Sequence, residues 1–177
     1  PSVVIVDLAC GTGSTVRALS PPIKARQHWH LVGNDLNLLA RVPSSSPSGV
    51  NVTATPIDLS RDLEAVFGDA TELITTSALL DLVSQDWLNR LAVAAAARRL
   101  PVYAALSYDG RVELAPTDLL DRGILDAVNR HQRTDKGFGP ALGPSAAKSA
   151  IAAFEGVGYR VMHRLADWEL GPADRAI

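Results

Sequence analysis

The chain has 177 residues, of which 47% are hydrophobic and 20% are charged, and its formal net charge is −2. This length fits one globular domain with its own core. The net charge shows no excess of basic residues, which proteins that bind nucleic-acid phosphates usually have. No apolar run approaches the roughly 20 residues that cross a bilayer. We therefore expect a single domain over residues 1–177, trimmed at both ends, with a small-molecule partner rather than nucleic acid or a membrane.

Cysteine usage indicates the compartment. Cys10 is the only cysteine, so it cannot form an internal disulfide, and no signal-peptide pattern opens the chain. A reducing environment is the usual setting for such a chain. We expect a cytoplasmic protein.

Short β-branched runs alternate with amphipathic or alanine-rich stretches along the chain. This alternation is typical of βα units around a mostly parallel sheet. Strands are predicted at residues 3–8, 30–34, 50–56, 72–76, 102–107 and 159–165. Helices are predicted at residues 14–19, 36–42, 60–67, 86–99, 117–129 and 145–155. The expected fold is a three-layer α/β domain of the Rossmann-like kind.

Capping residues support two of these helices. Ser84 or Asp86 can cap the alanine-rich helix at 86–99, because short polar side chains accept from the free N–H groups of a first turn. Ser60 can cap the helix at 60–67 in the same way.

The sequence DLACGTG joins the first predicted strand to the first predicted helix. Gly11 and Gly13 have no Cβ, so a ligand can approach the backbone closely at this junction. The spacing GxxxxGK[ST] of a phosphate-binding P-loop does not occur. The dinucleotide fingerprint fails at its third small position, which Val16 occupies. A nicotinamide cofactor is therefore the second choice.

The remaining pattern, Asp7-x-Ala9-x-Gly11-x-Gly13, resembles motif I of the class I S-adenosylmethionine-dependent methyltransferases, of bacterial type, with alanine in place of the first glycine. The resemblance implies S-adenosylmethionine as cofactor and S-adenosylhomocysteine as product. It also implies that the loop, with Cys10, passes beneath the methionine part and sugar of the cofactor. Asp7 would help to hold the cofactor's amino group.

Two further acids follow the second and third predicted strands. The resemblance implies that Asp35, followed by Leu36, accepts both ribose hydroxyls. It also implies that Asp58 lies beside the adenine amine, with Leu59 available to pack on the ring. Taken alone, each aspartate can equally cap a helix. Together with the glycine loop they fit one cofactor, because the carboxyl ends of parallel strands lie at one sheet edge.

The family resemblance also implies a sheet order. We expect 3-2-1-4-5 plus a sixth strand at residues 159–165, with the family's antiparallel seventh strand missing through truncation. An incomplete edge leaves backbone groups that can pair with another chain, so a homodimer through this edge is a possible state.

The acceptor is expected over the ends of strands four and five, where Ser77 follows one strand and Asp109 the other. Ser77 is also expected to contact the cofactor. The resemblance implies no obligatory catalytic residue, because the cofactor carries the activation. The sequence TTSA is not the [DNS]PP[YFW] motif of nucleic-acid amino-methyltransferases. His131, in a polar glycine-rich stretch that is either a lid or an exposed loop, and Asp109 are the candidates for a base. No metal site is expected.

Three functions stay open. The first is methyl transfer from S-adenosylmethionine to a small molecule. The second is a nicotinamide-dependent oxidoreductase, and the third is a non-catalytic domain that binds the cofactor or a protein partner.

Overall fold

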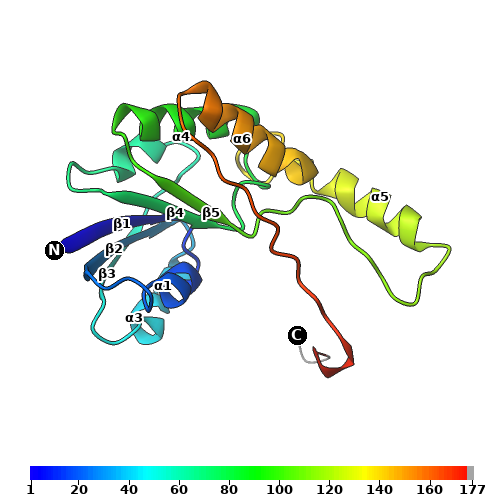
Figure 1. Ribbon diagram of the computed structural model, residues 1–177, viewed down its shortest axis with the longest axis horizontal. Coiled ribbons are helices and arrows are strands. Elements are labelled where there is room, and N and C mark those ends of the chain that lie inside the picture. The colour runs from blue at the N-terminus through cyan, green and yellow to red at the C-terminus, as the bar shows by residue number, and fades with distance from the viewer. Residues whose placement is uncertain (175–177) are drawn as a thin grey trace.

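The computed structural model describes residues 1–174, and helices pack on both faces of a central parallel sheet (Figure 1). The strands are β1 (Ser2–Leu8), β2 (Arg26–Gly33), β3 (Asn51–Pro56), β4 (Leu73–Ser77) and β5 (Val102–Ala105). Their order is β3-β2-β1-β4-β5, and each neighbouring pair is parallel. The predicted α/β class and the order of the first five strands are confirmed.

The helices follow the predicted alternation. They are α1 (Ser14–Leu19), α2 (Leu36–Leu39), α3 (Val42–Ser45), α4 (Gln85–Ala97), α5 (Asp121–His131) and α6 (Ala146–Gly156), with 3-10 turns η1 (Leu63–Val66), η2 (Gly143–Ser145) and η3 (Pro172–Asp174). Within residues 1–174, no helix is both long enough and apolar enough to cross a membrane.

Alternation along the strands builds a core on each face of the sheet. In β1, Ile5 packs with Trp29 and Leu31 on the side of α1 to α3, whereas Val6 and Leu8 join the core on the side of α4 and α6. Successive side chains of a strand point to opposite faces, so Asp7 shares the face of Ile5. An acid is thereby placed in a largely apolar interior.

Helix α4 begins as the sequence predicts. The Ser84 side chain accepts from the backbone N–H of Trp87 at 3.2 Å, which caps the first turn. The predicted helix at 60–67 is wrong, because η1 (Leu63–Val66) is its only helical part. Ser60 uses both its hydroxyl and its backbone N–H to bond Asp58, so this segment starts as a turn.

The predicted sixth strand at 159–165 is also wrong. These residues form no strand, and no strand within residues 1–174 pairs with the outer edge of β5. Tyr159 donates to the Leu100 carbonyl at 2.6 Å, and the chain then runs outward with mostly exposed side chains. β5 spans only four residues and is followed by Leu106 at φ +55°, which ends the edge that a further strand would need.

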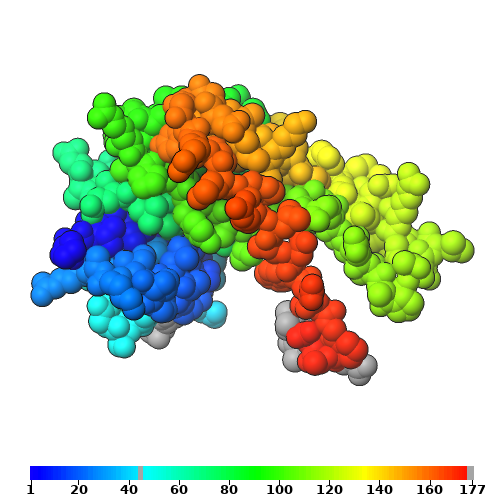
Figure 2. Space-filling view, in the orientation of Figure 1, coloured from blue at the N-terminus to red at the C-terminus, as the bar shows by residue number. Residues whose placement is uncertain are grey.

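Helix α5 and the C-terminal segment project from the body (Figure 2). No residue of α5 is buried, and its apolar stripe includes the exposed Ile124 and Val128. Near its end, Asn129 accepts from the Tyr108 hydroxyl at 2.8 Å and donates to the Gly110 carbonyl at 3.3 Å. These bonds attach the C-terminal part of α5 to the loop that follows β5.

Candidate functional site

The carboxyl ends of the strands lie at one edge of the sheet, as the three-acid pattern requires. Leu8 of β1 pairs with Val32 of β2 and with Thr76 of β4, and Gly33 pairs with Pro56 of β3. Each predicted cofactor residue lies at this edge or in the loop just beyond it. The edge is therefore the candidate site.

The glycine loop has the backbone that its sequence predicts. Ala9, Gly11 and Gly13 have φ angles of +54°, +55° and +83°, a conformation that glycine adopts without strain. A Cβ on Gly13 would lie 3.2 Å from Val16 Cγ1 and 3.3 Å from Leu31 Cδ1, so glycine is required there for close packing. A Cβ on Gly11 would meet open space, which leaves room above the loop for a ligand.

Ala9 and Cys10 contribute backbone rather than side-chain chemistry. Ala9 holds a left-handed conformation that costs a non-glycine residue about 1 kcal/mol. The Cys10 thiol is buried, contacts the Gly11 carbonyl at 3.6 Å, and burial raises its pKa to about 12. The thiol therefore stays protonated and unreactive near neutral pH.

Asp7 lies beneath the glycine loop and has no solvent exposure. Its Oδ1 accepts from the Thr75 hydroxyl of β4 at 2.7 Å, whereas its Oδ2 has no hydrogen-bond partner. Burial raises the pKa of Asp7 to about 7, and the hydroxyl groups of Thr75 and Thr15 offset only part of that rise. A buried carboxylate oxygen without a partner marks a place where an external donor is expected.

Asp35 caps α2, as one of its two predicted roles requires. Its Oδ1 accepts from the backbone N–H groups of Asn37 at 2.8 Å and Leu38 at 3.1 Å. Both bonds end on Oδ1, so the cap does not need the second oxygen. Asp35 and Leu36 are exposed at the sheet edge, which keeps both accessible to a ligand.

Asp58 forms a turn after β3. Its Oδ1 accepts from the Ser60 hydroxyl at 2.6 Å and the Ser60 N–H at 3.0 Å, and these bonds lower the pKa of Asp58. Leu59 does not present its side chain at an open surface, because that side chain is only 4% exposed and belongs to the main core. The structure therefore does not offer Leu59 as the predicted platform for adenine.

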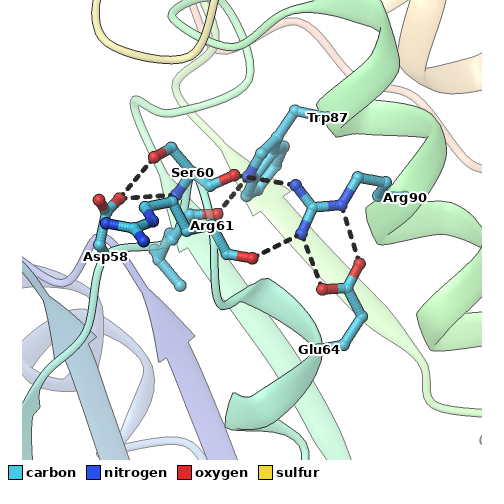
Figure 3. A network of polar contacts seen from close by, with 7 residues as sticks. Asp58, Ser60, Arg61, Glu64, Trp87 and Arg90 are labelled. Carbon is cyan, nitrogen blue, oxygen red and sulfur yellow. Dashed lines mark hydrogen bonds and ion pairs between the residues drawn. The ribbon is translucent and has the colours of Figure 1, made fainter.

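Two side chains of α4 donate hydrogen bonds to the backbone of the turn that carries Asp58 (Figure 3). Trp87 Nε1 donates to the Leu59 carbonyl at 2.6 Å, and Arg90 donates to the carbonyls of Ser60 at 2.9 Å and Arg61 at 3.0 Å. Three successive carbonyl groups are thus bonded to α4, which fixes the turn that carries Asp58.

Glu64 in turn fixes Arg90 by a two-point ion pair (Figure 3). Its two carboxylate oxygens accept from Arg90 Nε at 2.9 Å and Nη2 at 2.7 Å. The planar guanidinium fits this bidentate geometry, which orients it toward the turn. The Asp58 turn therefore rests on a rigid support rather than on a mobile loop.

The predicted acceptor-side residues are spread more widely. Ser77 ends β4, half-buried at the site edge. Asp109 follows β5, where Arg111 pairs with it at 2.6 Å and lowers its pKa against the effect of burial. His131 is exposed at the end of α5, with its ring 3.4 Å from Lys136 Nζ. An ion-paired acid and an exposed imidazole are weaker candidates for a base than a buried, unpaired group.

The stretch after His131 is folded against the body rather than loose. Asp135 Oδ1 accepts from the N–H groups of Gly137 at 2.7 Å and Gly139 at 3.0 Å. Phe138 contacts Trp87 edge to face, with ring centroids 5.6 Å apart. Among the described residues, no group of three His, Cys, Asp or Glu side chains could hold a metal ion.

Asp81 is an acid of this edge that sequence reasoning missed. It lies in the loop between β4 and α4, is 6% exposed, and its Oδ1 has no hydrogen-bond partner. Burial raises its pKa, although the backbone N–H groups of Asp81 and Tyr108 lower it in part. The sequence indicates this residue by placing an acid inside the apolar run ALLDLV. Such a run is usually buried, and a buried acid usually needs a partner or has a function.

Comparison with known proteins gives the fold a class. No protein-family model matches the chain, and no curated protein matches it by sequence. Solved structures match it by fold. A mycolic acid cyclopropane synthase complexed with S-adenosylhomocysteine and CTAB aligns at a TM-score of 0.61 and 13% identity, over 92% of this chain and 56% of that one.

Two further matches are methyltransferases. An arsenic(III) S-adenosylmethionine methyltransferase from Chlamydomonas reinhardtii aligns at a TM-score of 0.55 and 15% identity, over 88% of this chain and 51% of that one. An S-adenosylmethionine-dependent methyltransferase from Aquifex aeolicus aligns at a TM-score of 0.53 and 11% identity, over 91% of this chain and 74% of that one. The chain spans about half the length of the algal enzyme and of the cyclopropane synthase. Its fold is that of the class I S-adenosylmethionine-dependent methyltransferases.

Proposed function

We propose that this chain binds S-adenosylmethionine at the carboxyl edge of its sheet and transfers the methyl group to a small-molecule acceptor. One observation carries the proposal: Asp7 keeps a buried carboxylate oxygen without a partner near the end of β1, just before the left-handed glycine loop. The cationic amino group of the cofactor is the donor that such an oxygen lacks. The structural neighbours that carry S-adenosylhomocysteine support the choice of ligand.

The remaining residues fit the same ligand. Asp35 would accept the ribose hydroxyls and Asp58 would accept the adenine amine, each with a carboxylate at the edge. The backbone of residues 9–13 would run beneath the sugar. When bound, the cofactor supplies a methyl group already activated on a sulfonium, so these residues need only bind it and orient it.

Val16 argues against a nicotinamide cofactor. Its side chain is fully buried beneath the glycine loop and would lie in contact with any Cβ at Gly13. A dinucleotide loop has a compact residue at this third position, which lets the helix approach the strand and the pyrophosphate. The bulk of valine works against that approach.

Replacement of Asp35 tests the proposed ribose contact. We expect Asp35→Ala to weaken the binding of S-adenosylhomocysteine by about 1.5–3 kcal/mol, because charge-assisted hydrogen bonds are lost. Asp35→Asn should lose most of the same affinity while keeping the α2 cap, since asparagine caps a helix as well as aspartate does. Isothermal titration calorimetry measures both.

The matched control is Asp69→Ala, which removes an exposed aspartate from the loop before β4, at the opposite edge of the sheet. Its affinity for S-adenosylhomocysteine should equal that of the unaltered chain. Unchanged affinity in Asp35→Ala would remove Asp35 from the site.

A further inference from the structure

Two buried side-chain oxygen atoms in the described part of the chain lack a hydrogen-bond partner. Among the side chains that the structure describes, Asp7 Oδ2 and Asp81 Oδ1 are the buried oxygen or nitrogen atoms without a hydrogen-bond partner. Asp7 lies near the carboxyl end of β1, and Asp81 lies in the loop that follows the neighbouring strand β4. The proposed cofactor accounts for the first atom and leaves the second without a function.

Three loops meet around Asp81. The Asp81 carbonyl accepts from the Gly143 N–H at 2.8 Å, and the Val83 carbonyl accepts from the Leu142 N–H at 2.8 Å. The Tyr108 N–H approaches the Asp81 carboxyl from the loop after β5. The two carbonyl bonds fix the backbone of the loop that carries Asp81, and the carboxyl itself lies between the loop after β4 and the loop after β5.

Close packing around these loops limits their movement. A Cβ on Gly143 would lie 2.9 Å from the Gln132 carbonyl oxygen, and a Cβ on Gly110 would lie 2.7 Å from Pro144 Cβ. Neither neighbour is the flexible end of a long side chain. The loops are therefore closely packed at Gly110 and Gly143. A buried carboxylate oxygen without a partner is costly unless an outside group bonds it.

We infer that Asp81 is a catalytic residue of the acceptor site, where its carboxylate binds the hydrogen of an N–H or O–H group on the methyl acceptor. This inference rests on the proposed function. As the acceptor's heteroatom takes the methyl group, its bond to hydrogen breaks, the electron pair stays on the heteroatom, and the proton passes to Asp81. The carboxylate becomes a neutral acid while the sulfonium becomes a neutral thioether, so the charges balance.

The ionisable groups in and around the loop after β5 do not pair with Asp81. Tyr108 and Asp109 lie on the β5 side, and Asp109 is already paired with Arg111. Arg133 lies near the Tyr108 hydroxyl, whose pKa it lowers against the effect of burial. No ion pair of Asp81 occurs within residues 1–174. Asp81 is therefore free to take up a proton, and its raised pKa favours that step.

The test uses the whole chain, labelled at its aspartate carboxyl carbons and saturated with S-adenosylhomocysteine. Benzyl alcohol, benzylamine and benzyl methyl ether are added in turn, since the ether matches the alcohol but has no O–H group. We expect the alcohol and the amine to shift the Asp81 carbon resonance and the ether to leave it unchanged. An Asp81 resonance that neither the alcohol nor the amine moves would overturn the inference.

The affinities of two variants for the same probes provide a second test. We expect Asp81→Asn to lower the affinity for benzyl alcohol and benzylamine at least five-fold, whereas Asp86→Asn, an exposed aspartate in the first turn of α4, should match the unaltered chain. Equal affinities in Asp81→Asn and the unaltered chain would contradict the inference.

Calorimetry with S-adenosylhomocysteine separates the two proposals. Asp81→Asn should keep its affinity within two-fold of the unaltered chain. If the unaltered chain does not bind S-adenosylhomocysteine, the proposed function itself fails. If Asp81→Asn does not fold, the carbon resonance of the unaltered chain still decides.

Discussion

Asp7→Asn is expected to raise the free energy of unfolding at pH 8 while it weakens the binding of S-adenosylhomocysteine at least ten-fold. Burial raises the pKa of Asp7 from its ordinary 3.8 to about 7, so the ionised form is unfavourable in the folded chain. Each pKa unit corresponds to 1.36 kcal/mol, and a shift of roughly three units therefore destabilises the fold by about 4 kcal/mol at pH 8.

The sign of the pH dependence follows from the same shift. Below about pH 4 the Asp7 carboxyl is protonated in both folded and unfolded chains, and it does not affect stability. Between about pH 4 and pH 7 the unfolded chain releases the proton first, so stability falls as the pH rises. Above pH 7 the loss is complete.

Urea unfolding at pH 5 and pH 8 measures this effect. The gain in stability from Asp7→Asn should be about 2–3 kcal/mol larger at pH 8 than at pH 5. Asp69→Asn, at an exposed position, should show no such difference. An Asp7→Asn variant whose stability gain is the same at both pH values, or whose affinity for S-adenosylhomocysteine is unchanged, would contradict the role given to Asp7.

Trp87→Ala is expected to destabilise the fold by about 3–5 kcal/mol, the usual effect of deleting a large buried ring. The Trp87 side chain is 3% exposed, contacts Phe138, and donates to the Leu59 carbonyl at 2.6 Å. Its loss removes apolar contacts, opens a cavity and leaves a buried carbonyl without a donor. The turn that carries Asp58 would lose one of its three bonds to α4.

Trp168→Ala is the matched control, because this tryptophan is 70% exposed in the C-terminal segment. It should change the free energy of unfolding by less than about 0.5 kcal/mol. Trp87→Phe separates the two contributions, since it keeps most of the ring and removes only the N–H. Equal effects of Trp87→Ala and Trp168→Ala in urea unfolding would show that Trp87 does not anchor the turn.

Local patterns predicted the elements that depend on local chemistry. The β-branched runs gave five strands, and the glycine spacing gave a loop with φ angles above +50° at Gly11 and Gly13. Ser84 was identified as a cap because the cap is a contact within one helical turn. Such features need only neighbouring residues, so a sequence contains the information for them.

Features that need a distant partner were predicted less well. The alternating pattern at 159–165 suits a strand, but a strand forms only where a neighbouring edge accepts it, and β5 ends too soon. The sequence predicts Ser60 as a helix cap, whereas its hydroxyl donates to Asp58 Oδ1. The inward turn of Leu59 depends on Trp87 of α4, which is 28 residues away.

Asp81 shows the same limit within the candidate site. Its sequence neighbours are apolar, and its burial depends on loops around Tyr108 and Gly143 that lie far along the chain. The acids at the predicted strand ends are Asp7, Asp35 and Asp58, whereas Asp81 lies beyond the end of β4 in the loop before α4.

Calorimetric titration of the whole, unaltered chain with S-adenosylhomocysteine, and separately with NAD, tests the central claim most directly. We expect saturable binding of S-adenosylhomocysteine and none of NAD, because Asp7 Oδ2 lacks a donor and Val16 occupies the position at which a dinucleotide loop has a compact residue. Absence of binding to S-adenosylhomocysteine by the folded chain, or tighter binding of NAD, would contradict it.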